Sequence, residues 1–369
     1  MASCSYIGAA IFDGETLHQG AALNVADGRV ASIGPAEYDT VDLPPGTLSP
    51  GFLDLQVNGS GGLGVDGGTT AETLMRICAT QASLGATGCL PTLITDTPEA
   101  TATVVAAGIA AARRNTPGFL GLHLEGPHLD PRRKGAHDPA LIRQMTDSDL
   151  RLLVHAAGNL PSLMVTVAPE AVTTEQIAAL RSAGATVSLG HSDCSAATAL
   201  ATGATCATHL FNAMSQLGNR EPGLVGAVLS SNLYAGLIAD GIHVDPITLR
   251  IALAAKPDRI FLVSDCMALA GTELTEMVLG NRLILRKDGR LTLEDGTLAG
   301  ADLTIPRALQ VLTGIGISPV RALAMATTIP ASVIGRRDLG NLHPGASADM
   351  VHLSPDFTLN KVWRAGSEL

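Results

Sequence analysis

Four side chains that can bind a metal ion or transfer a proton each follow an apolar run of the sequence. Glu125 follows residues 119–124, His191 follows 186–190, His209 follows 205–208 and Asp265 follows 260–264. A carboxylate at the end of a buried strand needs a partner, because an unpaired buried charge is costly. Two histidines and one glutamate form a recognised catalytic zinc set that leaves one position open for water. The residue types therefore predict a catalytic metal site at Glu125, His191 and His209.

The apolar runs that carry these residues alternate with Ala-rich segments of helical pattern. We expect eight strands, at 52–57, 89–94, 119–124, 163–167, 186–189, 205–208, 234–239 and 260–263. Alternating strands and helices indicate a parallel sheet, and eight such units predict an α/β fold with a closed (β/α)8 TIM-like barrel. The four candidate residues then lie at the carboxyl ends of strands three, five, six and eight, where barrel enzymes place their catalytic groups. An open doubly wound sheet is the alternative, but the Gly-rich stretch 58–64 lacks the spacing of a phosphate-binding fingerprint.

Both ends of the chain have a different pattern. Short apolar runs at 5–12, 21–25 and 29–33 are separated by Asp-Gly and Gly-Pro turn signals, and the tail has strand-like runs at 348–353 and 361–364. We therefore expect residues 1–50 and 340–369 to form a small β-sandwich domain, with the barrel at 51–339. A further hairpin-like patch at 283–298 precedes helical segments at 304–313 and 319–327.

The composition excludes several classes of protein. A net charge of −10, only 3% aromatic residues and the lack of a basic stripe exclude a nucleic-acid-binding protein. There is no apolar run of about 18 residues, so no membrane span is expected. The first residues lack the basic and apolar regions of a secretory signal, and six scattered cysteines without a C-x-x-C motif indicate reduced thiols. We expect a cytoplasmic protein.

His123 competes with the other histidines for a place at the metal. It lies two residues before Glu125, so both side chains point to the same face of the strand. At the rise per residue of a strand, however, His123 lies about 6–7 Å deeper in the barrel. We therefore expect His123 to pack beneath the site.

Several motifs together resemble the N-acetylglucosamine-6-phosphate deacetylase family of the amidohydrolase superfamily. They are HLEGPHL (123–129), LGHS (189–192), ATHLFNAM (207–214) and LVSD (262–265). The resemblance covers nearly the whole chain, from PGFLD (50–54) to GTLAG (296–300). It implies hydrolysis of the acetamide of N-acetyl-D-glucosamine 6-phosphate to acetate and D-glucosamine 6-phosphate, a step of amino-sugar catabolism or cell-wall recycling.

The resemblance also implies a role for each matching residue. Glu125, His191 and His209 would hold the metal and Asp265 would be the general acid and base. Substrate would be bound by Ala136, His137, Asn212, Ala213, Arg220, His243, Leu298, Ala299 and Gly300. Among these, His243 and Arg220 would bind the 6-phosphate, and Arg220 would come from the neighbouring subunit of a homodimer.

Two departures from the wider pattern affect this expectation. Many superfamily members carry His-x-His on the first strand for a second metal, where this chain has Gln56 and Asn58. We therefore predict one divalent ion per subunit, zinc first, with iron, cobalt and manganese as alternatives. Cys266 stands where the family more often has alanine, and we expect it to be a small buried side chain.

Three other functions are compatible with parts of this pattern. The first is deacetylation of N-acetylgalactosamine 6-phosphate, because the position of one hydroxyl cannot be inferred from the sequence. The second is another amidohydrolase, such as a cyclic amidase or a base deaminase, although these usually use the first-strand histidine pair. The third is a non-catalytic scaffold with the amidohydrolase fold, against which the presence of Glu125, His191, His209 and Asp265 argues.

Overall fold

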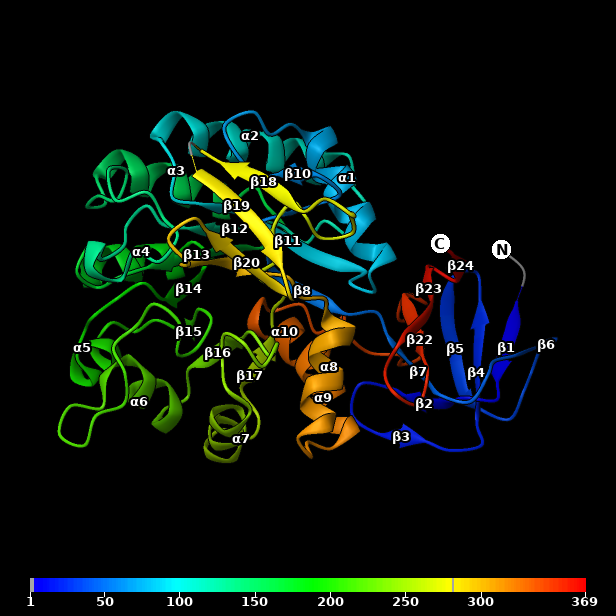
Figure 1. Cartoon of the computed structure of the whole chain (residues 1–369). Helices are drawn as coiled ribbons and strands as arrows, with labels where there is room; N and C mark the ends of the chain where they lie inside the picture. The colour runs from blue at the N-terminus through cyan, green and yellow to red at the C-terminus, as the bar shows by residue number, and fades with distance from the viewer. Residues whose placement is uncertain (1–2, 281) are drawn as a thin grey trace.

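Eight parallel strands form the barrel (Figure 1). The computed structural model describes residues 3–280 and 282–369. In the described chain the barrel strands neighbour one another in sequence order, each parallel to the next. They are β8 (Leu53–Val57), β11 (Gly88–Ile94), β12 (Leu122–Glu125), β13 (Leu163–Val167), β14 (Thr186–Leu189), β15 (Cys206–Ala207), β16 (Tyr234–Leu237) and β17 (Ile260–Leu262). The predicted (β/α)8 barrel is confirmed.

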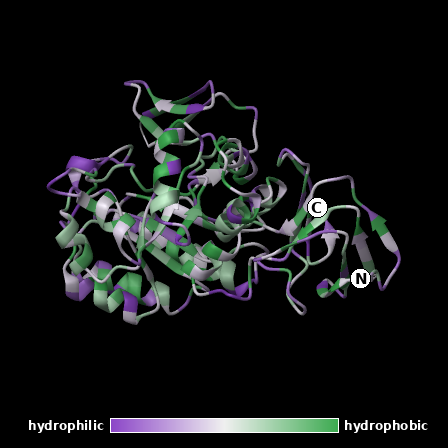
Figure 2. Ribbon diagram, turned by 90° about the horizontal axis from the view of Figure 1, so that it is seen from below, coloured by the Kyte–Doolittle hydropathy of each residue, from purple (hydrophilic) through white to green (hydrophobic). Residues whose placement is uncertain are grey.

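Helices follow the barrel strands and bury their apolar faces against the sheet. They are α1 (Ala71–Ser83), α2 (Pro98–Arg113), α3 (Asp147–Ala157), α4 (Thr174–Ser182), α5 (Ala196–Ala201), α6 (Gly223–Ser230), α7 (Pro246–Ala255), α8 (Ile305–Gly314), α9 (Pro319–Ala326) and α10 (Thr328–Val333). Threonine side chains cap several helix starts, as Thr70 does for α1 and Thr173 for α4. Hydrophobic colour extends over the strands and helices of the barrel (Figure 2), which share one large apolar core.

The seam between the first and last barrel strands is closed by residues that follow β17. The backbone N–H of Asp265 donates to the carbonyl of Gln56 at 3.0 Å, and that of Asn58 donates to the carbonyl of Cys266 at 2.9 Å. An isolated parallel bridge joins Val57 to Cys266. This closure brings the chain around Asp265 against the end of β8.

A four-stranded antiparallel sheet lies beside the mouth of the barrel (Figure 1). Its strands are β18 (Glu276–Leu279), β19 (Arg282–Lys287), β20 (Arg290–Leu293) and β21 (Leu298–Ala301). The hairpin expected at 283–298 is confirmed as part of this sheet. It has a small apolar core of its own around Ile284, Leu291 and Met267.

Both termini lie in a small β domain at one side of the barrel (Figures 1 and 2). One sheet contains β1 (Cys4–Ile7), β4 (Ala22–Ala26), β5 (Arg29–Gly34) and β6 (Thr40–Asp42). The other contains β2 (Ala10–Phe12), β3 (Leu17–His18), β7 (Thr47–Pro50), β22 (Met350–Leu353), β23 (Leu359–Arg364) and β24 (Ser367–Glu368). The N- and C-terminal segments therefore share one domain, as expected. The boundaries 1–50 with 340–369, and 51–339, stay a prediction.

The single strand expected at 5–12 is wrong. Gly8 divides it into β1 and β2, which belong to different sheets. Gly8 has φ +92°, and a Cβ atom there would lie 2.3 Å from the carbonyl oxygen of Leu43. Only glycine accommodates this approach, so the chain changes sheets at this residue. In the described part of the chain no helix is long and apolar enough to span a membrane.

Candidate active site

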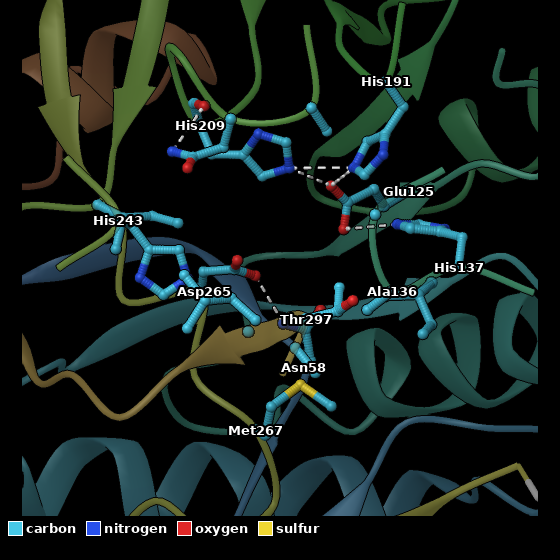
Figure 3. A pocket seen from close by; sticks show the side chains of 18 of the residues that line it. Asn58, Glu125, Ala136, His137, His191, His209, His243, Asp265, Met267 and Thr297 are labelled. Atoms are coloured by element: carbon cyan, nitrogen blue, oxygen red, sulfur yellow. Dashed lines mark hydrogen bonds and ion pairs between the residues drawn. The ribbon is translucent and has the colours of Figure 1, made fainter. Parts of the chain in front are cut away.

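Three predicted metal ligands converge at the carboxyl end of the barrel. Glu125 is the last residue of β12, His191 follows β14 and His209 follows β15. Oε1 of Glu125 lies 3.2 Å from Nε2 of His191 and 3.0 Å from Nε2 of His209. The two histidine Nε2 atoms are 3.1 Å apart. All three side chains are buried, and each offers one atom to a common point (Figure 3).

The backbone turns sharply where these side chains enter the site. His191, His209 and Asp265 have φ angles of +48°, +28° and +49°. Residues other than glycine rarely adopt this left-handed conformation, and each instance costs on the order of 1–3 kcal/mol. Strain of this kind concentrates at functional sites, where the surrounding structure holds it in place. Here it turns three strand ends so that their side chains point into the pocket.

The protonation states of these groups fit a divalent cation. Nδ1 of His191 lies 2.8 Å from the carbonyl oxygen of Arg133, which can only accept, so Nδ1 carries the hydrogen and Nε2 presents a lone pair. Although burial opposes ionisation, the neighbouring imidazole rings of His191 and His209 hold the pKa of Glu125 well below its usual range. An ionised carboxylate and a ring lone pair therefore converge on one point. A cation relieves their repulsion, and the donor set suits zinc, iron, cobalt or manganese.

Gln56 and Asn58 stand at the end of the first barrel strand, in place of the histidine pair that many superfamily members have there. The Gln56 amide donates to Oε1 of Glu125 at 3.1 Å. The Asn58 amide donates to Oδ1 of Asp265 at 2.7 Å. Both amides thus hold carboxylates of the site. Their neutral, weakly ligating character agrees with the prediction of a single metal ion.

Asp265 lies in the wall of the pocket and is 8% exposed. Burial, and then the nearby charge of Glu125, raise the pKa of Asp265 to about 6. A carboxyl group with a pKa near the working pH both accepts and returns a proton efficiently. The environment of Asp265 is therefore suited to general acid and base chemistry.

His137 presents a hydrogen-bond donor to the pocket. Its Nδ1 accepts a hydrogen bond from the hydroxyl of Thr95 at 2.7 Å and another from the backbone N–H of Thr95 at 3.3 Å. Burial and the nearby His191 hold the pKa of His137 well below its usual range, so the ring is neutral. Since Nδ1 accepts, Nε2 carries the hydrogen, and it lies 3.8 Å from Oε2 of Glu125. This N–H is available to a carbonyl oxygen bound beside the metal ligands.

His243 lies on the opposite side of the pocket from His137 (Figure 3). Its Nδ1 is 2.6 Å from Oδ2 of Asp240, whose other carboxylate oxygen accepts two backbone N–H groups. Although burial opposes ionisation, these bonds lower the pKa of Asp240. Asp240 therefore receives the Nδ1 hydrogen and orients the Nε2 edge of His243.

The pocket has a volume of about 410 Å³. Every residue predicted for the site except Arg220 lines it, which brings Ala136, Asn212, Ala213, Leu298, Ala299 and Gly300 together with the metal ligands, Asp265, His137 and His243. Arg220 lies on an exposed loop and does not line the pocket of its own chain. The sequence analysis missed Met267, Thr297, Ile94, Ile238 and Leu279 as lining residues. These types carry no chemical signal in a sequence, because only packing brings them to the pocket.

Two residues discussed as neighbours of the site lie outside it. His123 is fully buried beneath Glu125, with its ring nitrogens 3.1 Å from the carbonyl of Leu55 and 2.7 Å from the hydroxyl of Thr166. Cys266 is 1% exposed, and its Sγ accepts a hydrogen bond from the Gln81 side-chain amide at 3.2 Å. Its side chain packs behind Asp265, as expected for a small buried residue.

Comparisons with known proteins agree with this geometry. The amidohydrolase family profile matches residues 47–369. The chain is 38% identical to the N-acetylgalactosamine-6-phosphate deacetylase of Shewanella sp. (strain ANA-3), over 98% of this chain and 95% of that protein. It is 36% identical to the N-acetylglucosamine-6-phosphate deacetylase of Haemophilus influenzae, over 86% of this chain and 85% of that protein.

Solved structures of similar proteins superpose over almost the full chain. The N-acetylglucosamine-6-phosphate deacetylase of Pasteurella multocida matches with a TM-score of 0.95 at 31% identity, covering 100% of both chains. A mutant of the Mycobacterium smegmatis N-acetyl-D-glucosamine-6-phosphate deacetylase, in complex with N-acetyl-D-glucosamine-6-phosphate, matches with a TM-score of 0.91 at 30% identity. That match covers 99% of this chain and 98% of the other.

Proposed function

Because this chain belongs to the amidohydrolase family, we propose that it hydrolyses the acetamide of N-acetyl-D-glucosamine 6-phosphate to acetate and D-glucosamine 6-phosphate. The observation that carries the proposal is the convergence of Glu125, His191 and His209 in the same pocket as Asp265. The names of the Haemophilus and Pasteurella proteins support this substrate. The name of the Shewanella relative supports the galacto epimer as the second candidate.

The metal-binding residues define where the amide reacts. Glu125, His191 and His209 would hold one divalent ion, zinc as the first candidate. When bound, such an ion supplies a Lewis acid and lowers the pKa of water. Because Glu125, His191 and His209 share the pocket with Asp265, the amide carbon would lie between these residues and this carboxylate.

Asp265 would transfer the proton that amide hydrolysis requires. It takes a proton from water as the water oxygen bonds to the carbonyl carbon, and it returns this proton to the nitrogen as the C–N bond breaks. An amine leaves poorly unless it is protonated, so one group must act first as base and then as acid. The N–H of His137 would donate to the carbonyl oxygen as charge develops there.

The phosphate group would lie towards His243. Among the described residues that line the pocket, no lysine or arginine is present. A phosphate carries a double charge that an arginine satisfies well. We propose that the exposed Arg220 supplies this positive charge to the pocket of a second subunit, so that the active protein is a homodimer.

We also propose that the protein is cytoplasmic. Its six cysteines, all within the described residues, are unpaired, which supports a reducing compartment.

Acetate release tests the reaction. We would measure it from both epimeric N-acetylhexosamine 6-phosphates with chelated and metal-reconstituted protein. Asp265→Asn should lower release about 10²- to 10⁴-fold, whereas the same substitution at the exposed Asp258, just before β17, should leave it unchanged. Release from neither sugar by protein that holds stoichiometric metal would contradict the proposal. Metal analysis of the purified protein would identify the ion.

Subunit mixing tests the role of Arg220. Arg220→Ala should reduce kcat/KM for the phosphorylated sugar far more than for N-acetylglucosamine, because remote binding energy is realised in the transition state. If Arg220 acts across the interface, mixed Arg220→Ala and Asp265→Asn subunits should regain some activity. Equal losses on both sugars would contradict the phosphate role. No recovery from subunits shown to exchange would contradict action across the interface.

A further inference from the structure

Asn58 makes an unusual contact with the proposed acid and base. Its amide nitrogen lies 2.7 Å from Oδ1 of Asp265, and the side chains are 6% and 8% exposed. An ionised carboxylate can only accept, so the NH₂ group of Asn58 must face it. The amide oxygen is then buried without a hydrogen-bond partner among the described residues. A buried polar atom left unpaired is costly and requires an explanation.

The barrel seam holds this contact in register. The N–H of Asn58 donates to the carbonyl of Cys266, and the N–H of Asp265 donates to the carbonyl of Gln56. One residue earlier, the N–H of Ser264 donates to the carboxylate of Asp54 at 3.2 Å. These backbone bonds close the seam without the side chain of Asn58. The amide of Asn58 is therefore not needed for closure, and its one hydrogen bond serves Asp265.

We propose that Asn58 is a positioning residue that occupies Oδ1 of Asp265 and thereby makes Oδ2 the oxygen that carries the proton in amide hydrolysis. This inference rests on the proposed function. As the O–H bond of water breaks, the proton goes to Oδ2 while the water oxygen bonds to the carbonyl carbon. The same proton leaves Oδ2 for the nitrogen when the C–N bond breaks, so Asp265 returns to its ionised form.

Fixing one oxygen has a defined benefit. A free carboxylate rotates and exchanges two equivalent oxygens, whereas a reacting group must be aligned with its partner before transfer. Misplacement by about 1 Å lowers enzymatic rates by as much as about 10²-fold. Loss of the Asn58 donor should therefore lower kcat by about 10- to 100-fold, with little change in KM.

Two substitutions at Asn58 test the inference. Asn58→Asp keeps the shape and replaces the neutral amide donor by a second carboxyl group beside Asp265, and Asn58→Ala removes the whole amide. Asn232→Asp, at an exposed position before β16, is the control for an added charge. Both Asn58 variants should retain stoichiometric metal. If Asn58→Ala fails to fold, the isosteric Asn58→Asp decides.

The pH profile of kcat distinguishes positioning from a structural role. A donor to a carboxylate favours its charged form, so its loss should move the acid limb to higher pH, further in Asn58→Asp. The ionisable groups that interact with Asp265 are Glu125, His209, His243, Asp54 and Cys266. All five remain in both variants, so the shift in Asn58→Ala reports the lost donor, and the shift in Asn58→Asp also includes the added carboxyl group.

A combined variant gives the second readout. In an Asp265→Asn background, Asn58→Ala should cause no further loss, because the two residues act as a unit. Three results would each overturn the inference: the activity losses of the two substitutions multiply in the combined variant, the acid limb of the kcat–pH profile does not move, or the Asn58 variants lose the metal. If the unsubstituted protein releases no acetate, the proposed function fails. If it does so and both Asn58 variants keep its pH profile, only the role of Asn58 fails.

Discussion

Replacing Asp265 by asparagine should make the metal-free protein more stable while it removes activity. Burial and the charge of Glu125 raise the pKa of Asp265 to about 6, against 3.8 for the free side chain. At about 1.4 kcal/mol per pKa unit, ionising Asp265 costs the folded protein about 3 kcal/mol. Asparagine is neutral and can still accept the Asn58 bond, so Asp265→Asn avoids this cost.

The sign of the pH dependence follows from proton binding. Between pH 3.8 and about 6 the folded protein binds more protons at Asp265 than the unfolded chain does, so this residue lowers stability as the pH rises. The full cost is present above pH 6. The stability difference between Asp265→Asn and the unsubstituted protein should therefore be largest at pH 8 and small near pH 4.

Thermal unfolding of chelated protein measures this effect. Unfolding gains about 2.1 cal/mol/K of entropy per residue near 60 °C. Over 369 residues this is about 0.8 kcal/mol/K, so 3 kcal/mol raises the Tm by about 4 °C. Acetate release by the metal-reconstituted variant should fall about 10²- to 10⁴-fold, the usual contribution of a general acid or base. Asp258→Asn is the control in both assays.

A particular outcome would refute this reasoning. If chelated Asp265→Asn melts at the same temperature as the unsubstituted protein at pH 8, or below it, the buried carboxylate carries no such cost. The Asp265 environment would then be better solvated than its burial indicates. Retained acetate release would refute the assignment of Asp265 as the acid and base.

Three further predictions concern the metal, His137 and the first turn of α3. Chelation should abolish acetate release and lower the Tm, because converging ligand atoms lose their cation, and added zinc should restore both; unchanged activity at verified metal depletion would contradict this. Thr95→Val should lower kcat about 10-fold with unchanged metal content, because His137 loses one bond at Nδ1; metal loss on analysis would instead indicate a structural role. Although partial burial opposes it, bonds from Arg143 and Thr146 hold the pKa of Asp149 well below its usual range. This stabilisation is complete above pH 4 and is lost as the pH falls. Asp149→Asn should therefore reduce the free energy of unfolding by about 1 kcal/mol at pH 7 and by less below pH 4, as measured by urea unfolding at both pH values. An equal loss at both pH values would contradict an ionic origin of the stabilisation.

The residues of the candidate metal site could be predicted from the sequence because their signals are local. Each apolar run ends at a residue that can bind a metal or a proton, and the carboxyl ends of parallel strands meet at one rim. The sequence therefore predicts that Glu125, His191 and His209 converge, and the structure brings them together. The motifs around them also indicated the family, and the comparisons confirm it.

Other features were decided only by the tertiary structure. The contact between Asn58 and Asp265 joins residues 207 positions apart and exists because the barrel closes between its first and last strands. The apolar lining residues, such as Met267 and Ile238, reach the pocket through packing. Gly8 divides an apparently continuous strand because the backbone of Leu43 approaches it too closely for a side chain. Local pattern specifies which residue types stand at the ends of strands, whereas the closing of the barrel determines which of them meet.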